Sequence, residues 1–150
     1  MTDKHSALVI GGGIAGLQAS LDLAKVGVQV YLVERQPCLG GHTSLLYKVS
    51  PAMENAEELM KPIIQNVTQH PNIKIFSYSE IRAVAGSKGN FKVELLKKAR
   101  CVDEKKCTVC GECAKVCPVD VPKEYEMNVG TRKAIYLPSS YPVPAKYLID

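Results

Sequence analysis

No stretch of this sequence is long and apolar enough to cross a membrane, because Gln18 and Asp22 interrupt the best candidate before it reaches the ~18 residues that a span needs. Residues 1–5 lack the basic segment and the apolar run of an export signal. The net charge of +4 is small and the lysines are scattered, which argues against a surface for nucleic acid. Internal repeats and low-complexity segments are also lacking. We therefore expect a cytoplasmic protein without a membrane span or a nucleic-acid partner.

The composition excludes several further classes of protein. With 150 residues, 46% hydrophobic and 23% charged, the chain is neither disordered, collagen-like nor a coiled coil. Its six cysteines are the outlier. In a chain without an export signal they indicate metal or redox chemistry rather than structural disulfides. Cys38 stands alone and the other five lie within residues 101–117, so we expect two parts, 1–99 and 100–150.

The first part has an α/β pattern. Residues 7–10 form a short, continuously apolar run that is typical of a buried parallel strand. Apolar residues at helical spacing follow over residues 14–26, and Gly27 is a suitable C-terminal cap. Residues 28–33 read as a second strand. Strand, helix and strand in this order predict a βαβ unit, since parallel strands need a crossover.

The rest of the chain predicts more strands and one more helix. A helix is expected over residues 56–67, kinked or broken at Pro62. Strands are expected at 73–78, 81–85 and 91–96, with a hairpin turn at 86–90, and an extended, packed-down segment after Pro118. The expected fold class of the first part is α/β: an incomplete doubly wound, Rossmann-like half-domain.

A nucleotide-binding motif lies between the first strand and the first helix. Gly11-Gly12-Gly13-Ile14-Ala15-Gly16 fits G-x-G-x-x-G. Gly11 permits a tight turn, Gly13 lets the backbone approach a pyrophosphate, and Gly16 allows close packing of helix and strand. The helix N-terminus offers free N–H groups to phosphates, and Glu34, at the end of the second strand, can accept hydrogen bonds from ribose hydroxyls. The alternative is a glycine-rich turn that binds nothing.

Glu34 is followed at fixed spacing by Gly40-Gly41. This E-x5-G-G pattern resembles FAD-binding members of the disulfide-reductase-like flavoproteins, in which the Gly-Gly turn packs near the flavin's diphosphate and ribityl chain. The resemblance implies FAD rather than NAD, and it adds Gly40, Gly41 and the flanking Arg35 and His42 to the candidate cofactor-binding residues. The alternative is that Gly40-Gly41 is an ordinary loop turn.

The cysteines of the second part match the bacterial ferredoxin run C-x2-C-x2-C-x3-C-P, as Cys107, Cys110, Cys113 and Cys117-Pro118. This spacing predicts a [4Fe–4S] cluster, so we expect a ferredoxin-like [4Fe–4S] segment to follow the FAD-binding half-domain. It is too tight for a structural zinc site, which usually draws Cys pairs from separate knuckles. We expect an apolar jacket around the cluster from Val109, Ala114, Val116 and Val119.

Two alternatives stay open for these cysteines. In two-cluster ferredoxins the fourth cysteine of the run ligates the other cluster, so Cys101 could replace Cys117 as the fourth ligand, or that ligand could lie outside this chain. Alternatively, Cys110 and Cys113 could form a redox dithiol. Cys38, although close to the Gly-Gly turn, is not included in the site.

The combination of both motifs resembles the N-terminal portion of the A subunit of heterodisulfide reductase. The resemblance covers nearly the whole chain, through residues 9–19, 31–34, 70–73, 77–80, 89–93, 102–107 and 130–136. Its least generic piece is Gly130-Thr131-Arg132-Lys133-Ala134-Ile135-Tyr136, which no general flavin or ferredoxin argument predicts.

The resemblance implies an electron-transfer protein that passes electrons between FAD and [4Fe–4S] clusters in a cytoplasmic redox complex. The implied partners are other heterodisulfide-reductase-like subunits and ferredoxin or hydrogenase-type electron donors. Many such subunits carry a cysteine pair in the stretch that matches residues 42–53, and this sequence has none there. Family members also run to several hundred residues, so we expect this chain alone to bind FAD weakly or not at all and to be inactive. The alternatives are a thioredoxin-reductase-like disulfide reductase that uses Cys110 and Cys113, or a cluster-carrying module without flavin.

Overall fold

The computed structural model of the chain describes residues 5–139 and 142–150. The chain divides into two compact units, of which the first runs to Lys98 and also includes Ser139–Pro144. The second comprises Ala99–Pro138 and Ala145–Asp150. The tail therefore alternates between the units along the chain, which its sequence did not indicate.

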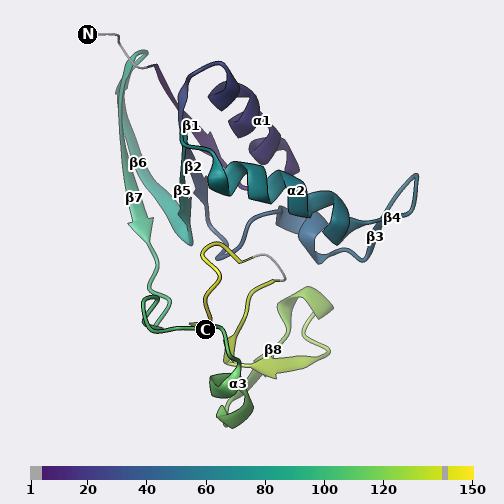
Figure 1. The fold of residues 1–150 in the computed structure, drawn as a ribbon. Helices are drawn as coiled ribbons and strands as arrows, with labels where there is room; N and C mark the ends of the chain where they lie inside the picture. The colour runs from purple at the N-terminus through teal and green to yellow at the C-terminus, as the bar shows by residue number, and fades with distance from the viewer. Residues whose placement is uncertain (1–4, 140–141) are drawn as a thin grey trace. The chain divides into compact units, whose positions relative to one another are not determined.

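The first unit is built on a parallel sheet of three strands in the order β1-β2-β5 (Figure 1). These strands are β1 (Ser6–Ile10), β2 (Gln29–Glu34) and β5 (Ile73–Ser77). Helix α1 (Ile14–Lys25) connects β1 to β2, and α2 (Ala56–Gln69) precedes β5. The predicted βαβ unit is confirmed, and β5 extends it by a third parallel strand.

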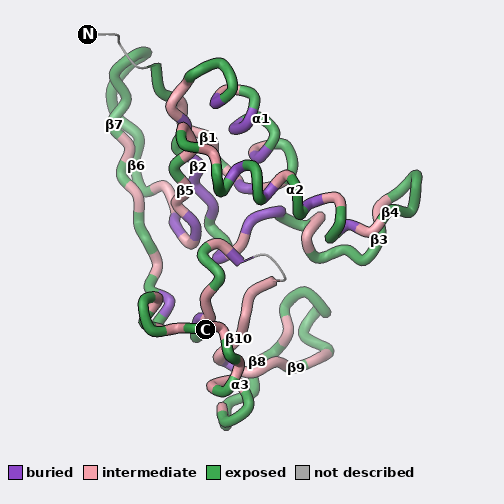
Figure 2. The backbone as a smooth tube through the Cα atoms, in the orientation of Figure 1, coloured by how far each residue is buried: buried purple, intermediate pink, exposed green. Residues whose placement is uncertain are grey.

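The core of this unit lies where α1 and α2 pack on the sheet. Its buried members come from both helices, from the central strand and from the loop after it: Leu17, Leu21, Leu32, Leu39, Met60, Ile64 and Val67. The helical members recur at spacings of three, four or seven residues, so each helix turns one apolar face inward. Figure 2 shows the buried residues of α1, α2 and β2 in purple.

Both helices have defined ends. At the end of α1, Val28 N donates to Leu23 O and Gly27 N donates to Ala24 O, each at 3.1 Å, which is a Schellman motif with Gly27 at φ +87°. The predicted glycine cap is thus confirmed. Asn55 is the N-cap of α2, and its side chain accepts a hydrogen bond from Glu57 N. Of the two outcomes expected at Pro62, a kink or a break, the break does not occur, because the helix continues through this residue.

The remaining elements of the first unit are a hairpin and short connections. Strands β6 (Ser79–Ser87) and β7 (Asn90–Lys97) are antiparallel and longer than predicted, with a two-residue turn at Lys88-Gly89. The 3-10 helix η1 (Gly41–Leu45) and the strands β3 (Lys48–Val49) and β4 (Glu54–Asn55) were not predicted.

The second unit contains little regular structure. Helix α3 (Glu112–Val116) is followed by β8 (Asp120–Pro122), η2 (Glu124–Glu126), β9 (Thr131–Lys133), β10 (Ile135–Tyr136) and β11 (Leu148–Ile149). Strand β8 pairs with β9 and β10 pairs with β11, both antiparallel. Within the residues described for this unit, Ala134 and Leu148 are the only buried hydrophobic side chains. So small a core usually needs support from a metal or a disulfide.

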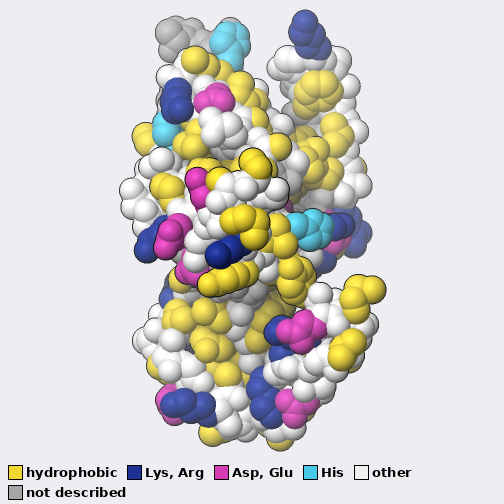
Figure 3. Space-filling view, turned by 90° about the vertical axis from the view of Figure 1, so that its right-hand side faces the viewer, with side chains coloured by type: hydrophobic (Ala, Val, Ile, Leu, Met, Phe, Trp, Pro, Cys, Tyr) yellow, Lys and Arg dark blue, Asp and Glu magenta, His cyan; other side chains and the backbone are white. Residues whose placement is uncertain are grey.

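Charges are mixed on the surface shown in Figure 3, where basic and acidic side chains are interspersed.

In the part of the chain that the structure describes, no helix is both long enough and apolar enough to cross a membrane.

Candidate functional site

The loop between β1 and α1 has the geometry that its glycines predict. Gly11 has φ +98°, a conformation that L side chains rarely adopt, and its N–H donates to Val33 O at 2.8 Å. A Cβ added at Gly16 would lie 1.9 Å from Gly11 O. The helix therefore lies directly on the loop, and only glycine fits at this contact.

The outer side of this loop is open. A Cβ added at Gly13 would meet no atom within 4 Å among the described residues. Gly13 is also the N-cap of α1, where no side chain caps the helix in the described structure and no acidic residue occupies the first turn. The first N–H groups of a helix have no partner within it, and they carry the positive end of the helix dipole. This end of α1 can therefore bind an anion such as a phosphate.

Glu34 has a structural role that the sequence did not reveal. Its side chain is buried, Oε2 accepts from Gly12 N at 2.6 Å, and Oε1 accepts from Gln36 N at 2.7 Å. The carboxylate thus joins the glycine loop to the turn after β2. A carboxylate has roughly four acceptor sites, so capacity for ribose hydroxyls remains.

The structure brings the two glycine motifs together. Gly40 N donates to Gly12 O at 2.8 Å, and Gly40 forms a parallel β-bridge with Gly13. A Cβ added at Gly41 would lie 3.1 Å from Gly13 Cα, which is tighter than ordinary contact. Gly40 and Gly41 both have positive φ, +104° and +55°. The Gly-Gly turn is therefore packed against the loop at the N-terminus of α1.

Two flanking candidates contribute differently. Arg35 and His42 are exposed. The pKa of Glu80 on β6 is lowered mainly by the hydrogen bond and charge of Lys98. The positive charge of Arg35 lowers it further, by a smaller amount. Among the interactions described, none joins Arg35 or His42 to the glycine loop.

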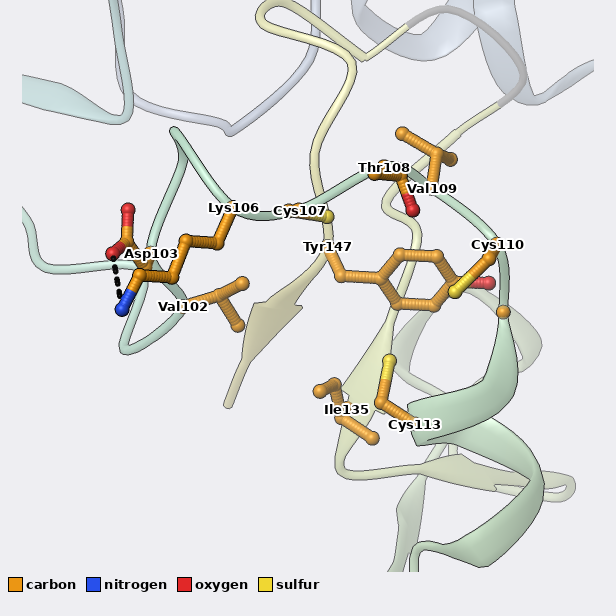
Figure 4. A pocket seen from close by; sticks show the side chains of 11 residues that line it. Val102, Asp103, Lys106, Cys107, Thr108, Val109, Cys110, Cys113, Ile135 and Tyr147 are labelled. Carbon is orange, nitrogen blue, oxygen red and sulfur yellow. Dashed lines mark ion pairs between the residues drawn. The ribbon is translucent and has the colours of Figure 1, made fainter.

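In the second unit, three of the four predicted cluster ligands line one cavity of about 260 Å³ (Figure 4). They are Cys107, Cys110 and Cys113, and Val109, Ile135 and Tyr147 share the lining with them. Cys117 and the exposed Cys101 do not line it. All six cysteines lie in the described part of the chain, and no disulfide joins any two of them.

The chemistry of this cavity fits an iron–sulfur cluster. Among the described residues, no three His, Cys, Asp or Glu side chains converge as they would on a single metal ion. In a cubane cluster each thiolate binds its own iron, so the sulfurs surround the cluster instead of converging on one point. The three thiols and the apolar side chains on the wall of this cavity are the residue types that such a cluster needs around it.

Hydrogen bonds favour the thiolate form of two cysteines in the run. The backbone of Glu112, and next the Thr108 side chain, lower the pKa of Cys110. The backbone of Ile135, and next that of Val119, lower the pKa of Cys117. The thiolate is the form that binds metal.

The predicted apolar jacket is largely wrong. Val109 lines the cavity, but Ala114 does not, and Val116 and Val119 are 78% and 53% exposed. Ile135 and Tyr147 take their place. Ile135 lies in the distinctive 130–136 segment, but no signal in the sequence pointed to Tyr147.

Comparison with known proteins supports the flavin half of this description. Residues 7–136 match the FAD-dependent oxidoreductase family. The described fold is similar to L-proline dehydrogenase from P. horikoshii, with a TM-score of 0.52 and 24% identity over 62% of this chain and 20% of that one. It is also similar to T. acidophilum thioredoxin reductase, with a TM-score of 0.50 and 24% identity over 59% of this chain and 29% of that one.

The sequence is more similar to curated heterodisulfide reductase proteins. It is 49% identical over 98% of its length to an iron–sulfur A subunit of CoB–CoM heterodisulfide reductase from Methanopyrus kandleri, and 46% identical over 97% to a protein of Archaeoglobus profundus named as similar to the heterodisulfide reductase A subunit. The chain spans about one fifth of these relatives, 22% and 21% of their lengths. The expected resemblance to the A subunit is therefore confirmed over nearly the whole chain, which belongs to the FAD-dependent oxidoreductase family.

Proposed function

We propose that this chain is the flavin-binding and cluster-binding part of an electron-transfer protein resembling the A subunit of heterodisulfide reductase. The observation that carries the proposal is the contact between Gly40-Gly41 and the loop at residues 11–16, beside an uncapped helix N-terminus. This arrangement suits a dinucleotide whose diphosphate lies on the helix end while the rest follows the Gly-Gly turn.

In this proposal the first unit holds FAD through its backbone. The N–H groups of Ile14, Ala15 and Gly16 face the diphosphate, and Gly13 lets it approach. Glu34 accepts from the ribose while it fixes the glycine loop from behind. Gly40 and Gly41, flanked by Arg35 and His42, face the flavin side of the diphosphate.

The second unit holds a [4Fe–4S] cluster in the same proposal, through Cys107, Cys110 and Cys113 on the cavity and Cys117 as the fourth ligand. Cys101 is the alternative fourth ligand. When bound, the flavin exchanges one or two electrons and the cluster exchanges one. The residues of the chain hold and tune these groups and do no acid–base chemistry themselves.

The proposed setting is a cytoplasmic complex. A relative in Methanococcus maripaludis, 46% identical over 97% of this chain, is named as the A subunit of an H2/formate:CoB–CoM heterodisulfide, ferredoxin reductase. That name supports related subunits, together with ferredoxin or hydrogenase-type donors, as the partners of this chain.

The cluster is tested on protein that is purified anaerobically. We expect brown protein that contains iron and sulfide and gives an EPR signal on reduction. Cys110→Ala should lose most of the iron, whereas Cys38→Ala, outside the run, should retain it. A colourless wild-type protein in which Cys110 and Cys113 form one titratable disulfide would contradict the cluster and favour a flavin-dependent disulfide reductase.

A further inference from the structure

We infer that Tyr147 covers the proposed cluster and shields it from water, a role that the cysteine motif does not reveal. The inference rests on the proposed cluster site. Tyr147 lines the same cavity as Cys107, Cys110 and Cys113, and Figure 4 shows the sulfur of Cys113 pointing toward its ring.

The hydroxyl end of Tyr147 meets the loop that carries the cysteines. A Cβ added at Gly111 would lie 3.3 Å from Tyr147 Oη, which is tighter than ordinary contact. Gly111 has φ +82° and links Cys110 to α3. The tyrosine therefore spans the cavity from the tail of the chain to the cysteine loop.

The residues on both sides of Tyr147 hold it in place. Lys146 Nζ donates to Cys107 O at 2.6 Å, so the tail is tied to the first cysteine of the run. Leu148 is buried and pairs with Tyr136 across the β10–β11 ladder. Because successive side chains of an extended segment point to opposite sides, the burial of Leu148 leaves Tyr147 on the side of the cavity.

An aromatic cover has a definite electrochemical consequence. The reduced cluster carries one more negative charge than the oxidised cluster, so water stabilises the reduced form more strongly. Keeping water away therefore lowers the reduction potential and also slows attack by oxygen. Replacing the ring by a methyl group should raise the potential and speed the loss of the cluster in air.

The test compares Tyr147→Ala, Tyr147→Phe and Tyr125→Ala in the full chain. Tyr125 is 52% exposed in η2 of the same unit and does not line the cavity, so it is the matched control. Iron content, circular dichroism, the midpoint potential from an EPR-monitored redox titration and the rate of bleaching in air are measured for each. We expect a positive shift of the potential and several-fold faster bleaching for Tyr147→Ala, and wild-type values for Tyr147→Phe and Tyr125→Ala.

The outcomes separate this inference from the proposed function. If wild-type protein holds no iron, the proposed cluster fails. If wild-type protein holds the cluster but Tyr147→Ala keeps the same potential and bleaching rate, only the role of Tyr147 is overturned. Should Tyr147→Ala lose its iron entirely, a folded, iron-replete Tyr147→Phe would still support the ring as the cover. A Tyr147→Phe variant that loses its iron as well would overturn that role.

Discussion

Replacing Gly16 by alanine should destabilise the first unit. The added Cβ would lie 1.9 Å from Gly11 O, whereas ordinary contact begins at 3.4 Å, so helix and loop must separate by about 1.5 Å. Overpacking of a core typically costs about 1–3 kcal/mol, and here both partners are backbone, with no rotamer to relieve the clash. The entropy that alanine removes from the unfolded chain returns only about 0.4–1 kcal/mol. We therefore expect Gly16→Ala to lose about 2 kcal/mol or more of unfolding free energy, measured by urea denaturation.

Gly13→Ala is the matched control three residues away. Its Cβ enters open space, and Gly13 has φ −75°, which any residue adopts. The unfolding free energy should stay close to that of wild type, because the lower entropy of the unfolded alanine chain offsets the preference of an N-cap for glycine over alanine. The same Cβ lies where the diphosphate is proposed to approach. Loss of one hydrogen bond to a charged group costs about 1.5–3 kcal/mol, or roughly ten- to hundredfold in affinity. The assay is titration with ADP, which carries the groups that a βαβ half binds. A Gly16→Ala variant as stable as wild type, or a Gly13→Ala variant with wild-type ADP affinity, would refute the reasoning.

Three further predictions concern single contacts. Glu34→Gln should lose about 1.5–3 kcal/mol in urea denaturation, because one amide oxygen has to serve two N–H donors; unchanged stability would contradict this role of the carboxylate. Asn55→Ala should cost about 1 kcal/mol through loss of the α2 cap, while ADP affinity stays the same. Lys98→Met should raise the pKa of Glu80 in a 13C NMR titration, because Lys98 lowers it in wild type. At pH values above the pKa that Glu80 has in the unfolded chain, the Lys98–Glu80 pair stabilises the fold. This stabilisation is lost as the pH falls through the lower pKa that Glu80 has in the folded chain. An unchanged Glu80 titration would show that Lys98 does not control it.

The parts of the first unit that could be predicted are those in which the backbone demands a particular residue. Gly11 and Gly27 both have positive φ, where side chains are strained, and Gly16 lies where a side chain would clash. Each of these positions requires glycine at a fixed place relative to a strand or a helix. The glycines in the sequence therefore indicate where the strands and helices begin and end. The contact of Gly41 with Gly13 was not predicted, because it joins residues that are far apart in the chain; the resemblance to flavoproteins indicated only that the Gly-Gly turn packs near the diphosphate.

Burial around the cysteines was harder to predict, because hydrophobicity alone does not say which side of a short helix faces a cavity. Val116 is apolar and adjacent to Cys117, yet it is 78% exposed at the end of α3. A five-residue helix has too few turns to show a periodic apolar face. Of the four cysteines predicted as ligands, three line one cavity, whereas hydrophobicity misplaced much of the wall around them.

The structure of the second unit depends on residues in the 130–150 region that belong to no recognised motif. The segments of this region lack the period of a helix or a strand, so each makes its contacts through single side chains that leave no pattern. In the 130–136 segment, the Arg132 guanidinium lies 3.7 Å from the centre of the Tyr136 ring and pairs with Asp150, while Ile135 lines the cysteine cavity. The ion pair ties the last residue of the chain to β9, and the β10–β11 ladder holds the backbone that follows Tyr147 beside the cavity. The 130–136 segment thus supports the wall of the cavity that Cys107, Cys110 and Cys113 line, and under the proposed function this wall would keep water from the cluster.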